Sequence, residues 1–302
     1  MDISIIRPES DNGFDFSDIT NEDVVLIPAF GLRVSDFERL RAIGCVLVDT
    51  TCGSVLNVWK RVERYAKDGI TAIVHGKHFH EETKATVSQV TKHEGGRYLI
   101  ARDLAEADLL CDFIRGDVPT EQVVATFGHK VSEGFEFETD LVCVGVANQT
   151  TMLASESLEM ARRISVALVD RYGPEALDDH FRTFDTICSA TQERQDAVLE
   201  LIEEPLDVMI VIGGYNWSNT NHLAKICSKR VPTYHIADAE CIDPATGMIR
   251  FKPVNGERET AADRWLEEIS IIGMTAGAST PNNKIGEAIE RVLQTKGLSV
   301  PA

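Results

Sequence analysis

Long apolar runs are absent from this chain of 302 residues. The run at residues 208–212 has the length of a strand and ends at glycine, whereas a membrane-spanning helix needs about 20 apolar residues. Residues 1–9 also lack a basic start followed by a long apolar stretch, so no signal peptide is expected. The sequence therefore predicts a cytoplasmic protein without membrane segments.

Basic charge is scarce. The chain has 30 Lys and Arg residues against 48 Asp and Glu residues, a formal net charge of -18. This balance argues against a nucleic-acid-binding surface and against binding to anionic membranes. A small anionic substrate remains compatible, because helix N-termini can bind phosphate locally whatever the total charge.

A framework of paired cysteines is also missing. The seven cysteines are an odd number and are scattered along the chain. This usage fits reduced thiols or cluster ligands better than disulfides.

Apolar strands and amphipathic helices alternate along almost the whole chain, which predicts an α/β fold with largely parallel sheets. Further helices are expected at about 156–171 and after Thr280-Pro281. The segment near 105–140 is expected to be an insertion with short helices, and the segment 243–263 is expected to be irregular. The helix after Cys52 should bury one stripe of side chains: Val55, Val58, Trp59, Val62, Tyr65 and Ala66. The helix after Cys188 should bury a second stripe: Ala197, Val198, Leu201 and Ile202.

A strand-Cys-helix pattern occurs twice, as Asp49-Thr50-Thr51-Cys52 and Asp185-Thr186-Ile187-Cys188. Each cysteine is followed at a nearly equal distance by an apolar run that ends in glycine, so whole supersecondary units recur. Two matched cysteines at helix N-termini suggest one shared centre. The positive end of a helix favours the thiolate, the form that binds metal, and this placement suits iron-sulfur ligation.

Polar clusters follow the apolar runs, at the edge where open parallel sheets bind ligands. Hydroxyl, amide and imidazole groups at helix starts are suited to phosphate or diphosphate. Taken singly, each cluster can also be interpreted as a plain helix cap. The four clusters are residues 78–83, 148–151, 216–221 and 275–280.

Six runs together resemble the 4-hydroxy-3-methylbut-2-enyl diphosphate reductase family, with its plant and cyanobacterial branch as the closer match. The resemblance extends from about Val24 to Leu293. The runs are Val48-Asp49-Thr50-Thr51-Cys52, His75-Gly76-Lys77, His80-Glu81-Glu82-Thr83, Ala147-Asn148-Gln149-Thr150-Thr151, the segment 188–197, and Thr275-Ala276-Gly277-Ala278-Ser279.

The resemblance implies a trefoil of three parallel-sheet α/β domains around a 4Fe-4S cluster, each domain supplying one cysteine. We expect residues 1–51 to be a remnant of a truncated first domain, 52–187 the second domain and 188–302 the third. Members of the family make isopentenyl and dimethylallyl diphosphate in the last step of a non-mevalonate isoprenoid route. A ferredoxin-like or flavodoxin-like protein would donate the electrons.

The resemblance also implies roles for individual residues. Cys52 and Cys188 match cluster ligands, and Glu82 matches the carboxylate that delivers protons to the departing hydroxyl. Loss of a hydroxyl as water needs an acid within hydrogen-bond reach, and burial can raise the pKa of a carboxyl to serve. Thr150 matches a hydroxyl that works with this acid and contacts substrate. Residues matched to diphosphate binding are His80, Ser218, Asn219 and Ser279.

Structural alternatives exist for each of these residues. Glu82 could be an ordinary solvated charge and His80 a surface or capping histidine. Either cysteine alone could be a buried small hydrophobe. The remaining cysteines are expected to be core or incidental thiols: Cys45, Cys111, Cys143, Cys227 and Cys241.

The chain departs from the family in several ways, and two of them concern cluster and diphosphate binding. The family's first Cys-x-Gly-Val turn has no counterpart here, and Cys45 is a candidate substitute ligand that a packed thiol would also explain. Trp217 stands where the family has a serine of its diphosphate-binding run. Two explanations stay open: a fragment of an active reductase, or a degenerate paralogue that binds or regulates without a functional cluster.

A nucleotide-binding α/β protein is a third hypothesis. Gly213-Gly214 or the segment 275–279 would hold the phosphates. No Gly-x-Gly-x-x-Gly or Walker pattern follows a strand, so this hypothesis and a dehydrogenase receive little support.

Overall fold

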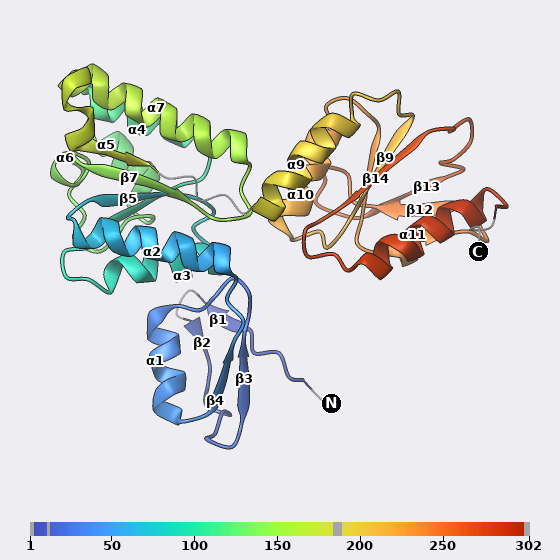
Figure 1. The fold of residues 1–302 in the computed structure, drawn as a ribbon, viewed down its shortest axis with the longest axis horizontal. Coiled ribbons are helices and arrows are strands. Elements are labelled where there is room, and N and C mark those ends of the chain that lie inside the picture. The colour runs from blue at the N-terminus through green and yellow to red at the C-terminus, as the bar shows by residue number, and fades with distance from the viewer. Residues whose placement is uncertain (1–2, 11–12, 184–188, 299–302) are drawn as a thin grey trace. The chain divides into compact units, whose positions relative to one another are not determined.

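The computed structural model describes residues 3–10, 13–183 and 189–298. The chain divides into two units, Met1–Ile187 and Cys188–Ala302, and each contains its own parallel sheet (Figure 1). Within the described ranges, no helix combines the length and the apolar character that crossing a bilayer requires.

The start of the first unit contains a parallel βαβ unit and a short antiparallel strand pair (Figure 1). Helix α1 (Val34–Ile43) connects β3 (Val24–Ile27) to β4 (Val46–Asp49), and the two strands pair in parallel. Gly44 ends α1 with a φ of 84°, a left-handed conformation that glycine adopts without steric penalty. The antiparallel pair is β1 (Pro8–Ser10) and β2 (Gly13–Phe14).

The centre of the first unit is a parallel four-stranded sheet in the order β6-β5-β7-β8. Every residue of β5 and β7 is buried, as expected for central parallel strands covered on both faces. His75 at the end of β5 lies opposite Asn148 at the end of β7, so the loops after these strands leave the sheet at the same edge. The strands are β5 (Thr71–His75), β6 (Tyr98–Ala101), β7 (Val144–Asn148) and β8 (Phe181–Thr183).

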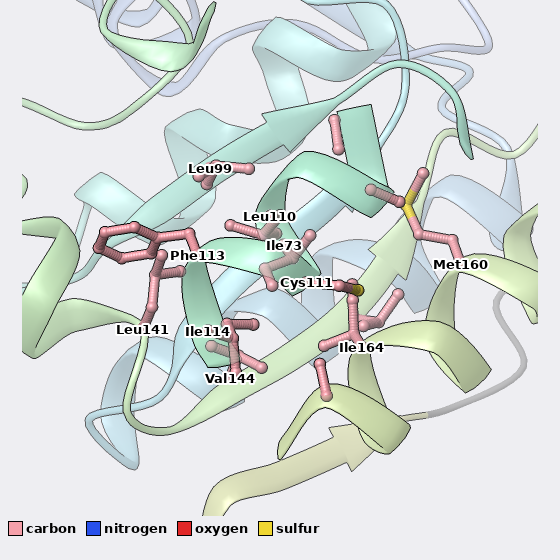
Figure 2. Packing of buried hydrophobic residues seen from close by; sticks show 14 of the residues in the cluster. Ile73, Leu99, Leu110, Cys111, Phe113, Ile114, Leu141, Val144, Met160 and Ile164 are labelled. Atoms are coloured by element: carbon pink, nitrogen blue, oxygen red, sulfur yellow. The ribbon is translucent and has the colours of Figure 1, made fainter. Parts of the chain in front are cut away.

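Helices cover both faces of this sheet, α2 and α3 on one face and α4 and α7 on the other (Figure 1). Figure 2 shows the core under α4 and α7, where Leu110, Ile114 and Ile164 belong to one cluster with Ile73 of β5. The segment near 105–140, predicted as an insertion, supplies most of α4 together with α5 and α6, and its Phe127 lies in the same core. The helices are α2 (Gly53–Lys67), α3 (Glu81–Thr91), α4 (Leu104–Arg115), α5 (Thr120–Phe127), α6 (Phe137–Asp140), α7 (Ala154–Tyr172), a 3-10 turn (Pro174–Ala176) and α8 (Leu177–His180).

The buried stripe of α2 confirms the predicted helical spacing, apart from Trp59, which is only half-buried. Tyr65 packs directly on Gly145 of β7, because a Cβ atom at residue 145 would lie 2.5 Å from the ring carbon Cζ. The Tyr65 hydroxyl donates a hydrogen bond to the carbonyl of Val146 at 3.1 Å. A glycine is therefore required where the helix crosses this strand.

Replacing Gly145 by alanine should lower the free energy of unfolding by about 1–3 kcal/mol, the usual effect of overpacking a core. The matched control is Gly286→Ala in α11 (Asn282–Thr295), where no atom lies within 4 Å of the added Cβ. That change should raise stability by about 0.5–1 kcal/mol, because alanine is the better helix former. Urea unfolding measures both, and an unchanged stability of Gly145→Ala would contradict the close contact with Tyr65.

The second unit has a parallel three-stranded sheet in the order β10-β9-β14. Its central strand β9 is buried throughout. The predicted α/β class with parallel sheets is therefore confirmed in both units. The elements are α9 (Ser189–Leu201), β9 (Val208–Ile212), α10 (Ser218–Cys227), β10 (Thr233–Ile236), β14 (Ile272–Ala276) and α11.

Residues 243–263 were expected to be irregular, and this expectation was wrong. They form most of an antiparallel sheet in the order β11-β12-β13, which we call the meander. Ile249 in the middle strand is fully buried and lies opposite Ala262. The strands are so short that apolar alternation is not visible in the sequence. They are β11 (Ile242–Asp243), β12 (Met248–Phe251) and β13 (Thr260–Asp263), preceded by a 3-10 turn (Ala239–Cys241).

The buried stripe of α9 also differs from the prediction. Ala197 is exposed and Leu201 is half-buried, whereas Val198 and Ile202 are buried as expected. Two polar residues, Thr191 and Gln195, complete the buried face. A prediction from apolar residues alone places the stripe too far around the helix.

Candidate active site

The loops after β5 and β7 bring together two predicted site residues, Glu82 and Thr150. Glu82 lies in the first turn of α3 and is 3% exposed, and Thr150 is 5% exposed. Glu82 Oε1 accepts a hydrogen bond from the backbone N–H of Thr150 at 2.5 Å. The Thr150 hydroxyl also hydrogen-bonds to this carboxyl group. The alternative interpretation of Glu82 as a solvated surface charge is therefore wrong.

Burial raises the pKa of Glu82, because the charged form loses its contact with water. The two hydrogen bonds from Thr150 act in the opposite direction, since they stabilise the carboxylate, but burial has the larger effect. A buried carboxyl with a raised pKa retains its proton to a higher pH than an exposed one. This is the property that a general acid needs.

His80 is the N-cap residue of α3, so its capping interpretation is correct for one ring nitrogen. Its Nδ1 accepts a hydrogen bond from the backbone N–H of Glu82 at 3.2 Å. Because Nδ1 accepts, the neutral ring carries its proton on Nε2. Burial, followed by the charge of Lys77, lowers the pKa of His80. The ring is thus neutral near pH 7 and has one N–H available as a donor.

Gln149 is a site residue to which the sequence assigned no role. It is fully buried, and its Oε1 accepts from the backbone N–H of Lys77 and the hydroxyl of Thr83, both at 3.2 Å. Its Nε2 donates to the Thr151 hydroxyl at 2.9 Å. The side chain therefore fixes the loop that carries Thr150 against the start of α3. In the sequence, the only signal for it is an amide side chain directly after an apolar run.

Cys52 lies at the N-terminus of α2, where the repeat predicted it. It is the N-cap residue, and its side chain is exposed. Its backbone N–H donates to the carbonyl of Ala29 at 2.8 Å, which ties the residue to the end of β3. An exposed thiol at the start of a helix of 15 residues is accessible to a metal.

The second predicted ligand, Cys188, lies outside the described residues. Within the ranges that the structure describes, no three His, Cys, Asp or Glu side chains are grouped as a metal site. The ligand roles of Cys52 and Cys188 therefore stay predictions.

The other described cysteines include several packed thiols. Cys45, the candidate substitute ligand, is buried with Phe16 and Leu40, and its thiol donates to the carbonyl of Leu40 at 3.5 Å. Burial raises the pKa of Cys111 to about 11 and that of Cys227 to about 12. These two thiols are protonated near pH 7 and are poor metal ligands.

In the second unit, two predicted diphosphate-binding residues start α10. Ser218 is 4% exposed and Asn219 is 6% exposed. Neither Oδ1 nor Nδ2 of Asn219 has a hydrogen-bond partner in the part of the chain that the structure describes. Leaving a buried amide without partners typically costs about 1–3 kcal/mol. An anion at the helix N-terminus would satisfy Nδ2, because free N–H groups and the helix dipole favour negative charge there.

The loops after β9 and β14 are packed around one hydroxyl group. Thr220 Oγ1 is buried, and a Cβ atom added at Gly213 would lie 2.8 Å from it. A Cβ atom at Gly277 would clash with the same hydroxyl. Thr280 is buried beside them and donates to the carbonyl of Ile212 at 3.2 Å, whereas the predicted site residue Ser279 is exposed.

Trp217, the departure from the family noted above, is the N-cap residue of α10. Its ring lies against Gly214, because a Cβ atom at that glycine would lie 3.0 Å from the ring carbon Cε2. The side chain is 45% exposed. The bulky ring is therefore accommodated by a glycine next to the first turn of α10.

The two units have parallel sheets, with a buried carboxyl at one set of strand ends and, among the described residues, an unpartnered amide at a helix start. This arrangement suits an α/β enzyme that binds anions. The family model described as LytB protein matches residues 4–293. The chain belongs to this family.

Curated cyanobacterial relatives carry the name 4-hydroxy-3-methylbut-2-enyl diphosphate reductase. The relative from Synechococcus sp. (strain CC9605) is 44% identical over 295 residues, which are 97% of this chain and 72% of the relative. The relative from Synechococcus sp. (strain RCC307) is 46% identical over 281 residues, 93% of this chain and 68% of the relative. The predicted family and the predicted enzyme class, an oxidoreductase, are confirmed.

Two solved structures share the fold. The E-1-hydroxy-2-methyl-but-2-enyl-4-diphosphate reductase from Plasmodium falciparum has a TM-score of 0.65 at 18% identity, over 92% of this chain and 70% of its own. The structure described as the terminal enzyme of the non-mevalonate pathway has a TM-score of 0.52 at 24% identity, over 93% and 79%. At these identities the likeness supports the fold alone.

Proposed function

We propose that this chain reductively removes the hydroxyl group of 4-hydroxy-3-methylbut-2-enyl diphosphate and forms isopentenyl and dimethylallyl diphosphate. The name of its cyanobacterial relatives supports this substrate. The structural observation that carries the proposal is the buried carboxyl of Glu82, which the N–H and hydroxyl of Thr150 hold at the strand ends.

The reaction breaks a C–O bond and forms a C–H bond. It takes up two electrons and two protons and releases one water molecule. Glu82 donates one proton to the departing hydroxyl, and the second proton goes to carbon. The carboxylate that remains on Glu82 is stabilised by the two Thr150 hydrogen bonds until it is protonated again. Burial raises the pKa of this carboxyl and so favours its protonated form before the reaction.

Cys52 and Cys188 are the proposed ligands of a 4Fe-4S cluster, which when bound passes electrons to the substrate. The exposed Cys52 thiol at a helix N-terminus fits one ligand position. A ferredoxin-like or flavodoxin-like protein is the proposed source of the electrons.

The diphosphate is assigned to residues that offer donors. His80 contributes its Nε2–H, because Nδ1 is used by the N–H of Glu82. Asn219 contributes an amide that no described residue satisfies. Ser218 at the start of α10 and Ser279 in the loop between β14 and α11 are proposed to donate their hydroxyl groups.

A second candidate function is a paralogue that binds the diphosphate or regulates without a functional cluster. Trp217 favours this candidate, because a large ring beside Gly214 occupies the position where the family places a small donor. The two candidates differ in iron content and in turnover, so one experiment separates them.

The test is reconstitution of the full chain with iron and sulfide under anaerobic conditions, followed by assay with a chemically reduced electron donor. We expect bound iron, bound sulfide and conversion of the hydroxylated diphosphate to both products. Cys52→Ser should lose iron and turnover, whereas Cys143→Ser should keep both, since Cys143 is a half-buried thiol away from the helix starts. Pyrophosphate binding without bound iron or turnover would contradict the reductase function and support the paralogue.

A further inference from the structure

The loop between β9 and α10, residues 213–217, is held from several sides. The loop closes on itself through the N–H of Trp217, which donates to the carbonyl of Gly214 at 3.0 Å. Asn221 of α10 donates from Nδ2 to the carbonyls of Tyr215 at 2.8 Å and Trp217 at 2.9 Å. We call these residues the α10 loop, since they set the position of the first turn that carries Ser218 and Asn219.

A buried histidine of the neighbouring strand fixes the start of the α10 loop. His235 of β10 is 1% exposed, and its Nε2 lies 2.9 Å from the carbonyl of Gly213. A carbonyl only accepts, so Nε2 carries the proton. Burial lowers the pKa of His235, which keeps the ring neutral near pH 7. The ring of Tyr215 meets it edge-on at a centroid distance of 5.1 Å.

The meander supplies the remaining anchor. The Tyr215 hydroxyl donates to Glu259 Oε1 at 2.8 Å, a contact between residues 44 positions apart in the sequence. Glu259 stands directly before β13, and its other oxygen lies 3.7 Å from Arg250 Nη1 of β12. The Cys241 thiol lies 3.8 Å from Glu259 Oε1. Burial, followed by the bond to Glu259, raises the pKa of Tyr215, so its hydroxyl stays a donor.

We propose that Glu259, acting through Tyr215, is a positioning residue for diphosphate binding at the first turn of α10. This inference rests on the proposed function, which assigns the diphosphate to Ser218 and Asn219. The meander then has a specific purpose, because it holds the α10 loop in the shape that presents those two side chains. A loop that is ordered before the anion arrives loses less conformational freedom on binding.

The test measures inorganic pyrophosphate binding to the full chain by calorimetry, and KM and kcat of the reconstituted enzyme. Tyr215→Phe and Glu259→Ala should each weaken pyrophosphate binding and raise KM roughly two- to tenfold, the range of one ordinary hydrogen bond. The double variant should be no worse than either single variant, because both remove the same contact. Values of kcat should not change, since neither side chain contacts the proton donor Glu82.

Conservative and distant variants separate positioning from a loss of stability. Glu259→Gln should keep near-normal binding, because the amide oxygen still accepts from Tyr215. Glu287→Ala, which removes a carboxylate of α11 paired with Lys284, should bind pyrophosphate normally. A fall in kcat that accompanies the rise in KM would overturn the positioning role. An equal loss of pyrophosphate affinity in Glu259→Gln and Glu259→Ala would overturn it as well.

Asn219→Ala distinguishes failure of this inference from failure of the proposed function. If Asn219→Ala weakens pyrophosphate binding but Tyr215→Phe and Glu259→Ala do not, the positioning role is wrong and the binding site stands. If Asn219→Ala binds pyrophosphate normally, the diphosphate assignment is wrong and the inference falls with it.

Discussion

Replacing Glu82 by glutamine is expected to stop turnover while the fold and the thiol ligands remain intact. Glutamine has nearly the same size, and its carbonyl oxygen can accept the N–H of Thr150 that Glu82 accepts at 2.5 Å. It has no acidic proton to give. General acid catalysis typically contributes about 10²- to 10⁴-fold, so kcat should fall by that factor in a steady-state assay with unchanged iron content.

The same substitution should change how stability depends on pH. Burial raises the pKa of Glu82 in the folded protein above its unfolded value. The folded state is therefore penalised as pH rises through the folded pKa, and the penalty is absent below the unfolded pKa. Glu82→Gln removes this dependence, so its stability relative to the wild type should increase from acidic to neutral pH in urea unfolding.

The neighbouring residue provides a matched control. Glu81 lies beside Glu82 in the first turn of α3 and pairs with Lys84 at 3.1 Å. Glu81→Gln should therefore keep turnover. If Glu82→Gln retains wild-type kcat, or if both variants lose turnover equally, Glu82 is not the proton donor.

Replacing Asn219 by alanine should weaken diphosphate binding and leave the protein at least as stable. A hydrogen bond to a charged group contributes about 1.5–3 kcal/mol, so pyrophosphate affinity should fall roughly 10- to 100-fold. Without ligand, both polar atoms of this amide are buried and without a described partner. Their removal relieves a penalty, which offsets the lost packing. Calorimetry and thermal unfolding measure the two effects separately.

Asn283 offers a control at the equivalent position of another helix. It is the second residue of α11, as Asn219 is of α10, but it is exposed, and its Nδ2 lies 3.3 Å from Glu287. Asn283→Ala should leave pyrophosphate binding unchanged. Loss of stability without loss of affinity in Asn219→Ala would show that the amide is structural.

The sequence predicted the elements that carry strong periodicity. The apolar stripe of α2 and the placement of Cys52 at its start follow from helical spacing and the repeat. The buried strands β5 and β9 are continuous apolar runs, so they too were recognisable. The motif resemblance then supplied roles for Glu82 and Thr150 that spacing alone does not give.

The sequence could not predict contacts between residues that are far apart along the chain. Glu82 hydrogen-bonds to Thr150, which lies 68 residues further along the chain. Gln195 takes a buried place on α9 because the surrounding fold accepts a polar group there. The contact between Tyr215 and Glu259 joins one loop to the residue directly before β13, a strand too short to recognise in the sequence. No local pattern encodes such pairs.

The Thr220 hydroxyl lies close to both Gly213 and Gly277, and this constrains how the protein can evolve. Neither glycine can gain even a methyl group while the threonine is present. A lineage must first remove the hydroxyl of residue 220 before Gly277 can vary, whereas Gly213 stays a glycine in either case, because its φ of 144° disfavours any side chain. Substitutions at residues 220 and 277 should therefore occur in a fixed order, with residue 220 changing first.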